Sequence, residues 1–552
     1  MSGRNADSHF AVNPTRVDMT RSRFDRGSSH KTTFNAGDVV PFYVDEVLPG
    51  DTFSIDTSMI VRMQSLITPM MDNIYLDTYY FFVPSRLCWE HWRNLMGENT
   101  ESAWIPTTEY QVPQITAPAD GGWSQNTIAD YMGVPTKVPG LSVNALPFRA
   151  YALICNEWFR DENLTDPMVV PLGDATVAGV NTGNYLTDVA KGGLCFKAAK
   201  YHDYFSAALP SPQKGADVLI PVAAAENLPV MSLPNQIPTI PSVGQREVFA
   251  RTYSDTNNFG YWSSSQNSVV QSDSFDSALS NSELTPLNLW AVQSGNAAAA
   301  TINQLRTAFQ IQKLYERDAR GGTRYIELLK SHFGVTSPDA RLQRPEYLGG
   351  RRIPINVNQI VQTSATETSG TPQGNVTGLS VTNDVHSDFT KSFVEHGFVI
   401  GVMVARYPHT YQQGLERMWS RKTRFDYYWP VFANIGEQAI LNKEIYAQGS
   451  AADDEVFGYQ EAWADYRYKP SRVSGEMRSN AQTSLDIWHL ADDYSSLPSL
   501  SDSWIREDSA TVDRVLAVSE RVSNQFFADI YVRNRCTRCM PLYSVPGLID
   551  HH

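Results

Sequence analysis

Runs of β-branched and aromatic residues, bounded by proline and glycine, dominate the chain after residue 38. Such runs are typical of β-strands. They predict strands over residues 39–47, 52–63, 74–83, 398–406, 427–432 and 526–532. Within the third run, residues 79–83 are apolar at every position, as expected of a strand whose sheet is covered on both faces. The pattern therefore indicates a protein that is mainly β.

Helical spacing of apolar residues appears in fewer places. It predicts a short helix at 87–96 and a longer one at 148–159. Two more helices are expected at 297–320, before Gly321 and Gly322, and at 325–332, before Gly334. Since no fixed-period repeat occurs, and strands begin and end the chain, we expect a β-sandwich with large insertions rather than alternating βαβ units.

Local composition and hydrophobic periodicity change along the chain and divide it into four parts. Residues 1–35 lack hydrophobic periodicity and are interpreted as a basic N-terminal arm. Residues 36–204 hold the first strands with loop and helix insertions. Residues 205–290 are rich in Pro, Ser and Asn, which indicates an irregular insertion that either has a function of its own or is held by neighbouring chains. Residues 291–552 hold a helical insertion and the remaining strands, and within them 362–383 is predicted to be a surface loop.

Composition excludes several classes of protein. Of 552 residues, 42% are hydrophobic and 11% aromatic, so the chain can bury a large core. Its longest strongly apolar run, residues 398–405, is far shorter than the roughly 20 residues of a membrane helix. The start of the chain does not have the pattern of a secretory signal, and five cysteines do not make a disulfide framework. We expect synthesis in a reducing cytoplasm and no membrane insertion.

Charge is unevenly distributed. The chain carries 59 acidic and 45 basic residues, a net charge of −14, whereas a protein that mainly neutralises phosphates would be basic. The first 35 residues are the exception, with six basic and three acidic side chains. This segment is either a solvated tail or an arm by which a shell protein reaches packaged nucleic acid. The candidate nucleic-acid-facing residues are therefore Arg4, Arg16, Arg21, Arg23, Arg26 and Lys31.

The sequence shows no motif for phosphate binding, for a hydrolase nucleophile or for a zinc protease. Its one Cys-x-x-Cys, Cys536 with Cys539, has no second pair of ligands nearby, and a metal or redox role is the less favoured interpretation. We interpret these cysteines as small buried side chains near a C-terminal strand. No catalytic residues, metal or cofactor are expected.

Other polar and aromatic groups allow more than one interpretation. His386 and His396 are either metal ligands or ordinary scattered histidines, the second being favoured. Adjacent acidic pairs could bind a cation or act as acid and base, but we favour solvated loops for them. These pairs are Asp453 with Asp454 and Asp492 with Asp493.

Clusters of aromatic residues could stack bases or sugars. Burial in the core, or between subunits, is the favoured alternative. The clusters are Tyr79 with Tyr80, Tyr427 with Tyr428 and Trp429, and Trp463 with Tyr466 and Tyr468.

Four stretches of the sequence resemble the major capsid proteins of gokushoviruses, which are small tailless single-stranded-DNA phages of the Microviridae. The resemblance covers nearly the whole chain and is weakest in 205–290 and 362–383. The stretches are YYFFVPSRL (79–87) with WEHW (89–92) and MGEN (96–99); LRTAFQIQK (305–313), ERDARGGTRY (316–325), SHFGV (331–335) and PDARLQRPEYLGG (338–350); IGEQ (435–438) and NKEIY (442–446); and VFGYQEAWADYRYKP (456–470).

This resemblance implies a single eight-stranded viral jelly-roll β-sandwich with long loop and helical insertions. About 60 identical copies would close into a T=1 icosahedral shell around circular single-stranded DNA. The insertion at 205–290 would form a protrusion at the three-fold axes and serve in host attachment. The N-terminal arm would face the interior.

Further partners are also implied. They are a small basic DNA-binding protein, which the net charge of −14 independently suggests, a scaffolding protein during assembly and a bacterial surface receptor. Assembly would take place in the host cytoplasm and the product would be part of the virion. Two alternatives remain open: an all-β carbohydrate-binding or carbohydrate-active protein, and a single-stranded-nucleic-acid-binding protein.

Overall fold

The protein is described by a computed structural model. It gives residues 20–100, 108–216, 218, 302–364 and 373–543, together with the backbone of six short strands between residues 230 and 291. The chain divides into two compact units. The first consists of Met1–Lys214 with Glu316–His552, and the second consists of Gly215–Tyr315.

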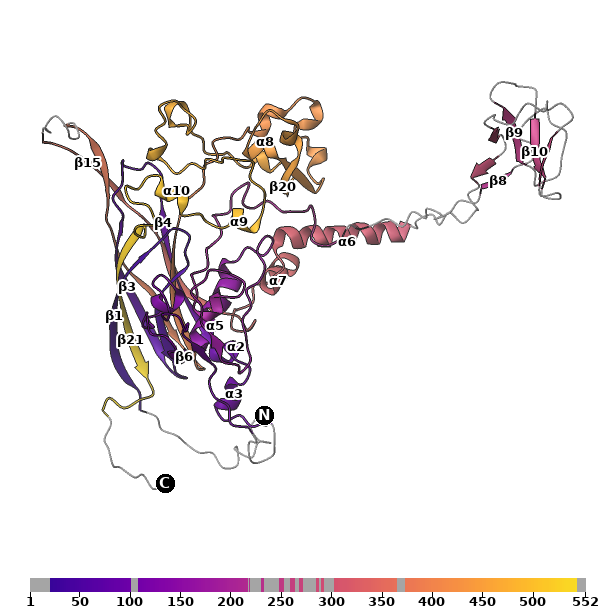
Figure 1. Cartoon of the computed structure of the whole chain (residues 1–552). Helices are drawn as coiled ribbons and strands as arrows, with labels where there is room; N and C mark the ends of the chain where they lie inside the picture. The colour runs from indigo at the N-terminus through magenta and orange to yellow at the C-terminus, as the bar shows by residue number, and fades with distance from the viewer. Residues whose placement is uncertain are drawn as a thin grey trace. The chain divides into compact units, whose positions relative to one another are not determined.

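Two four-stranded antiparallel sheets form the centre of the first unit (Figure 1). One sheet has the strand order β1-β21-β3-β17 and the other has the order β14-β4-β18-β2. In chain order the strands are β1 (Ser22–Phe34), β2 (Val40–Val47), β3 (Thr52–Met63), β4 (Tyr75–Pro84), β14 (Glu346–Pro354), β17 (Thr382–Ser392), β18 (Gly397–Arg406) and β21 (Phe526–Arg538). The unit is thus mainly β, as predicted.

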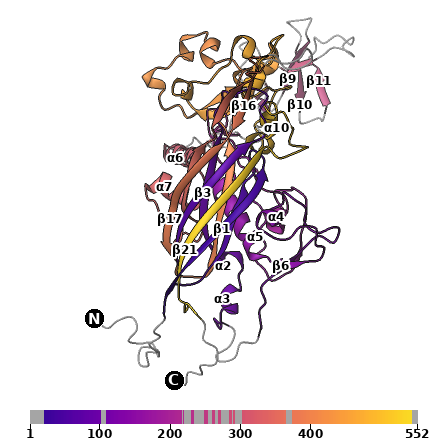
Figure 2. The same ribbon diagram turned by 90° about the vertical axis from the view of Figure 1, so that its left-hand side faces the viewer.

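The main core lies between these two sheets. Buried and exposed side chains alternate strictly along most of β3 and β21, because successive residues of a strand point to opposite faces. Phe53 and Phe526 of the first sheet share a core cluster with Tyr80 and Met403 of the second. The opposite face of the first sheet is open to solvent, and Figure 2 looks onto that sheet.

The second sheet is covered on both faces, which confirms the prediction for residues 79–83. Tyr80 and Phe82 belong to the core between the sheets, whereas Phe81 and Val83 belong to a second core. Helix α5 (Leu146–Ile154) contributes most of its residues to that second core. It continues into a π-helical segment at Cys155–Phe159, so the helix predicted at 148–159 is confirmed.

Most predicted strands are confirmed. They correspond to β2, β3, β4, β18 and β21, although β21 runs further than residue 532. The strand predicted at 427–432 is wrong, since this stretch contains the 3₁₀ turn Pro430–Phe432 and follows another at Arg424–Asp426. The loop predicted at 362–383 is wrong from residue 376 onward, where β16 (Val376–Ser380) and the start of β17 lie.

Two of the remaining helix predictions are confirmed and one is wrong. α6 (Ile302–Gly321) and α7 (Tyr325–Phe333) are confirmed within the described residues, and Gly334 ends α7 in the left-handed conformation that favours glycine. A single helix at 87–96 is wrong. Trp89 is extended and buries its indole, which donates to Asp174 at 2.6 Å, and so separates α2 (Ser85–Cys88) from α3 (Trp92–Leu95).

The N-terminal arm also requires a correction. Residues 22–34 are not an arm but strand β1, which pairs with β21 along its whole length, from Ser22 opposite Arg538 to Phe34 opposite Phe526. Polar residues fill most of β1, so local hydrophobic periodicity did not reveal it. Its backbone groups are satisfied by a strand about 500 residues away in the sequence.

Smaller elements complete the first unit. The remaining strands are β5 (Gln114–Thr116), β6 (Ser142–Asn144), β7 (Val177–Ala178), β15 (Val357–Val361), β19 (Glu437–Leu441) and β20 (Val456–Glu461). The remaining α-helices are α4 (Ile128–Tyr131), α8 (Asn442–Ile445), α9 (Asp502–Ile505) and α10 (Ala510–Asp513). Further 3₁₀ turns are Val189–Lys191, Arg417–Ser420, Ala451–Asp454, Ala464–Tyr466, Gly475–Met477 and Asp486–Trp488.

The second unit contains short strands, so the stretch predicted to be irregular has some regular structure. Two sheets occur in it, with orders β11-β10-β9-β12 and β13-β8. The unit starts at Gly215 rather than at residue 205, since Phe205 and Ala208 belong to a core of the first unit. The strands are β8 (Val230–Ser232), β9 (Val248–Thr252), β10 (Phe259–Ser263), β11 (Ser268–Gln271), β12 (Leu284–Pro286) and β13 (Leu289–Ala291).

Candidate nucleic-acid interface

The predicted basic residues fall into three groups. Arg4 and Arg16 lie outside the described residues. Arg21, just before β1, donates to the carbonyl oxygen of Gly50 at 3.3 Å. Arg23, Arg26 and Lys31 all lie on β1. Because side chains alternate along a strand, these last three cannot share one face.

Arg26 points away from the exposed face of the first sheet. It is paired in register with the buried Asn534, and its guanidinium makes two hydrogen bonds to Asp45, at 2.6 and 2.9 Å. Burial lowers the pKa of Arg26, but the bond to Asp45 more than compensates, so the pKa is raised overall. Arg26 therefore stabilises the sandwich edge and is not available to phosphate.

Arg23 and Lys31 lie on the open face. Arg23 is opposite Thr537 and Lys31 is opposite Asp529, at positions where β21 exposes its side chains. The same face carries Arg533 and Arg535 from β21 and Arg62 from β3. We call this surface the basic sheet face; its cations are Arg23, Lys31, Arg62, Arg533 and Arg535.

Three aspartates on the same face pair with three of these cations. Arg533 contacts Asp25 at 3.0 Å, Arg535 contacts Asp56 at 2.5 Å, and Lys31 contacts Asp529 at 3.3 Å. Such exposed pairs contribute little to stability. Within the described part of the chain, Arg23 and Arg62 make no ion pair. The face therefore carries a net positive charge on a chain whose total is −14.

Two aromatic rings lie among these charges. Tyr531 and Phe527 are exposed on β21, on the same side as Arg533. The absence of a side chain at Gly27 leaves room for Tyr531 to cross β1, since a Cβ there would lie 2.3 Å from the phenol oxygen. Exposed rings between cations are the arrangement by which proteins hold single-stranded nucleic acid without sequence preference.

Sequence reasoning missed the cations contributed by β3 and β21. The available signal was the alternation at the C-terminal strand, where Arg533 and Arg535 are separated by the buried Asn534. That alternation shows that the two arginines share an exposed face. It does not show that this face is also that of Arg23, because the neighbour of β21 is β1 at the other end of the chain.

The histidines and acidic pairs have structural partners. His386 lies between Asp384 and Asp388, at 2.5 and 2.8 Å, on β17. His396 packs against the ring of Trp92. Among the described residues, no group of three or more His, Cys, Asp or Glu is arranged to hold a metal ion.

Asp492 corrects one interpretation, because it is buried rather than on a solvated loop. It contacts His409 at 2.9 Å, and the other imidazole nitrogen of His409 contacts Glu507 at 3.1 Å. Its neighbour Asp493 accepts a hydrogen bond from Gln413. Asp453 caps the loop backbone at Gln448 and Gly449, and Asp454 pairs with Lys443.

The cysteines are free thiols in the structure. Cys536 is buried on β21, and burial raises the pKa of its thiol to about 11. Cys539 follows the strand and is partly buried. A thiol with so high a pKa is a poor nucleophile and metal ligand at neutral pH.

The aromatic clusters divide between core and surface. Tyr80 lies in the main core, and Trp463 is also buried. Tyr427, Tyr428 and Trp429 are exposed, so burial in the core of the monomer is excluded for them. No helix in the described part of the chain has the length and apolar character needed to span a bilayer.

Comparison with known proteins shows where the chain belongs. A family described as capsid protein (F protein) matches residues 13–548. The chain is 43% identical to capsid protein VP1 of Bdellovibrio phage phiMH2K, over 99% of each chain. It is 42% identical to capsid protein VP1 of Chlamydia phage 1, over 98% of each.

A third relative gives the same result. The chain is 42% identical to capsid protein VP1 of Spiroplasma virus 4, over 94% of each chain. These relatives are structural proteins and not enzymes, and a capsid protein is a component of the virion that assembles with copies of itself. The chain therefore belongs to the phage capsid protein (F protein) family, and its resemblance to gokushovirus major capsid proteins is confirmed.

Proposed function

We propose that this chain forms a T=1 icosahedral shell of about 60 copies that encloses circular single-stranded DNA. Match to a capsid family over nearly the whole chain is the observation that carries this proposal. The sandwich of the first unit would be the building block of the shell wall, the basic sheet face would look inward, and the second unit would serve in host attachment.

The order of the strands supports a jelly roll. Numbered along the chain, the first of the strands in the two large sheets pairs with the last, the second with the seventh, the third with the sixth and the fourth with the fifth. All four pairs are antiparallel. This is the pattern of one long hairpin folded over on itself, which places alternate pairs in opposite sheets, as in viral jelly rolls.

Charge supports the inward orientation of the basic sheet face. An acidic chain that encloses DNA gains most by placing its few unpaired cations on the genome side. Arg23 and Arg62 make no ion pair with any residue that the structure describes, and Tyr531 lies on the same face. Five cations offset by three carboxylates cannot neutralise a packaged genome, so a separate small basic protein would supply the remaining charge. A scaffolding protein would hold shell intermediates together during assembly.

The two-unit organisation supports a separate role for residues 215–315. A unit that is compact by itself can change without disturbing the sandwich core. This suits a protrusion at the three-fold axes that contacts a bacterial surface receptor. The all-β carbohydrate-binding alternative would place its site in the monomer, where it would act without assembly.

Particles and adsorption test the shell and attachment roles together. We expect electron microscopy of particles from the expressed chain and its phage partners to show closed shells of about 60 copies. A variant with residues 215–315 replaced by a short Gly/Ser linker should lose adsorption to host cells. Absence of closed shells from the unaltered chain would refute the shell proposal. Intact variant particles that adsorb normally would refute the attachment role.

Salt dependence of binding tests the basic sheet face. We expect Arg23→Gln with Lys31→Gln and Arg62→Gln to lower the slope of log affinity against log salt for oligo(dT) by about 2, since each lost phosphate contact removes about 0.7. Unassembled protein and fluorescence anisotropy suit the measurement. The matched control neutralises three exposed cations elsewhere, Lys137, Lys330 and Arg341. Equal slopes for the two triple variants would contradict the assignment of this face.

A further inference from the structure

One segment of the first unit exposes several aromatic side chains close together in the sequence. We call residues 415–435 the aromatic loop; it precedes β19 and lies in the orange part of the chain, near α8 and β20, in Figure 1. Every residue from 422 to 431 is exposed. The exposed large side chains include Trp419, Phe425, Tyr427, Tyr428, Trp429 and Val431.

The size of this surface matches a protein interface. Trp419 is 69% exposed and Val431 is 81% exposed. Together with the other four aromatic rings they leave roughly 500–800 Å² of side-chain surface open, taking typical aromatic areas. A standard interface buries about 800 Å² on each partner. Runs of exposed apolar residues of this kind mark interaction sites rather than ordinary surface.

Hydrogen bonds within the loop support its backbone, although the loop contributes little to a core. Asp426 accepts hydrogen bonds from the backbone of Lys422, at 2.9 Å, and of Thr423, at 2.7 Å. The indole of Trp429 donates to the carbonyl oxygen of Arg424 at 2.9 Å. A surface that is organised before binding loses less conformational entropy when a partner docks.

Several ring faces are already occupied, which disfavours base stacking. The guanidinium of Arg421 lies 4.3 Å from the ring centre of Tyr466 and 5.5 Å from that of Tyr427. Arg424 lies over the ring of Phe425 at 4.9 Å. Tyr428 packs edge-on against Trp463. Aromatic residues supported by arginine, with their outer edges free, are typical of the centre of a protein–protein interface.

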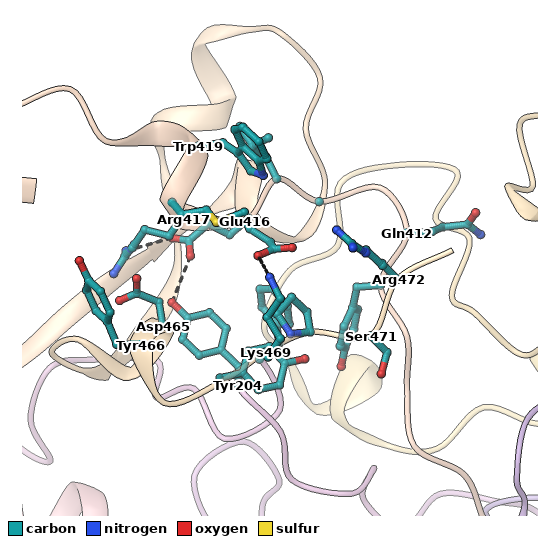
Figure 3. A pocket seen from close by; sticks show the side chains of 18 of the residues that line it. Tyr204, Gln412, Glu416, Arg417, Trp419, Asp465, Tyr466, Lys469, Ser471 and Arg472 are labelled. Carbon is teal, nitrogen blue, oxygen red and sulfur yellow. Dashed lines mark hydrogen bonds and ion pairs between the residues drawn. The ribbon is translucent and has the colours of Figure 1, made fainter. Parts of the chain in front are cut away.

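A pocket beside the loop offers room for a side chain of the partner. It has a volume of about 560 Å³ and is lined by Trp419, Glu416, Arg472 and Lys469, among others (Figure 3). Glu416 and Lys469 are joined by a hydrogen bond of 2.6 Å at its wall. Tyr204, which also lines the pocket, donates a hydrogen bond to Glu444 at 3.1 Å. A pocket next to exposed aromatic anchors is the usual setting of an interface hot spot.

Charge favours an acidic partner. The aromatic loop carries four cations and two carboxylates. Arg417 is paired with Glu444 and Arg421 with Asp465, so among the described residues Lys422 and Arg424 are the cations of the loop that make no ion pair. The chain as a whole carries −14, so the surface of another copy is acidic on average. Complementary charge favours encounter and fixes the orientation of such a contact.

We propose that the aromatic loop and its pocket dock onto a second copy of this chain and form a contact between subunits of the shell. The inference deepens the proposed shell function and rests on it. Because identical subunits are related by symmetry, each chain would supply one loop and receive another at a second surface, or meet its own loop across a two-fold axis.

The test compares one double variant with a matched control. Trp419→Ser with Val431→Asp removes an anchor and introduces a charge at the centre of the loop. The control, Val394→Asp, places the same charge at an exposed valine in the turn before β18. We expect the double variant to lower the yield of closed particles by about tenfold or more, as loss of a hot spot does, while the control assembles like the unaltered chain. Thermal unfolding of unassembled protein verifies that both variants are folded.

Footprinting by hydroxyl radicals supplies a second measurement. In particles made from this chain, Trp419 and Trp429 should lose most of the reactivity that they show in unassembled protein. Normal shell yield of the folded double variant would overturn the proposal, as would rings that stay reactive in the shell. Protection that appears only on addition of single-stranded DNA, a glycan or another phage protein would also overturn it. Failure of the unaltered chain to form shells would instead refute the proposed function.

Discussion

Replacing His409 by Gln should lower the free energy of unfolding by about 3–5 kcal/mol near pH 6, because it leaves two buried carboxylates without the cation between them. The imidazole lies between Asp492 and Glu507, and all three side chains are almost fully buried. Lys200, 3.8 Å from Asp492, is a weaker partner. Urea unfolding followed by tryptophan fluorescence measures the loss.

The same cluster predicts a dependence on pH. Burial by itself lowers the pKa of His409, but the two carboxylates outweigh it and raise that pKa to about 9. The folded pKa thus lies above the unfolded value of about 6.5. The stabilisation is therefore complete below about pH 6.5 and is lost as the pH rises through 9, a difference of about 3 kcal/mol.

His202→Gln is the matched control, since His202 is exposed on the segment that follows Lys200. Because its side chain is exposed, this variant should unfold at pH 6 with the same free energy as the original protein. A His409 variant as stable as the original protein at pH 6 would contradict the charged imidazole. The charged imidazole would also be contradicted if the difference in unfolding free energy between the original protein and the His409→Gln variant were the same at pH 6 and at pH 10.

Phe526→Ala should cost about 3–5 kcal/mol of unfolding free energy, as removal of a fully buried phenyl ring does. Phe526 is 0% exposed and stacks on Phe34, with ring centres 5.2 Å apart, where β21 begins and β1 ends. The next residue, Phe527, points to the basic sheet face. Phe527→Ala should change stability by no more than about 0.5 kcal/mol.

This adjacent pair tests the register of β21, since a slip of one residue would exchange the two faces. Thermal and urea unfolding of both variants give the comparison. Equal losses for Phe526→Ala and Phe527→Ala, or a larger loss at Phe527, would contradict the described sandwich. If Phe526→Ala is less stable but binds oligo(dT) with an unchanged dependence of affinity on salt, Phe526 acts in the core and not in the proposed contact with DNA.

The buried strands were predictable because their own side chains carry the signal. Burial alternates along β3 from Thr52 to Met63, apolar residues hold all the buried positions except Thr57, and the predicted bounds agree with the structure. β18 is apolar on both faces, since one face meets the main core and the other meets the second core. In these segments the local pattern and the final environment agree, which is the condition for prediction from sequence.

Two other segments show how local pattern fails. β1 was interpreted as an arm because Arg26 and His30 fill inward positions that apolar residues usually hold; they bond instead to Asp45 and to the carbonyl oxygen of Phe42. Residues 427–432 have the composition of a strand but lack a pairing partner in the structure described. Their aromatic rings are exposed instead of packed against a neighbouring strand, and composition alone does not show which of the two occurs.

The candidate interface was only partly predictable for the same reason. Of the six basic residues named from the sequence, Arg23 and Lys31 lie on the basic sheet face, Arg26 is bound to Asp45, and Arg21 bonds to Gly50. Arg62, Arg533 and Arg535, which complete the face, had no signal that linked them to the N-terminus. Alternation shows which side chains of one strand share a face, but not which strand lies beside it.

The sequence by itself determined that the chain is mainly β, that it has a large apolar core and an acidic balance, and, through its motifs, that it resembles one capsid family. Only the tertiary structure decided that Ser22 lies opposite Arg538, and thus which cations form one surface and which rings stay exposed. The physical reason is that strand pairing joins backbone groups hundreds of residues apart. Those groups are chemically alike in every residue, so the choice among partners depends on the packing of the whole sandwich.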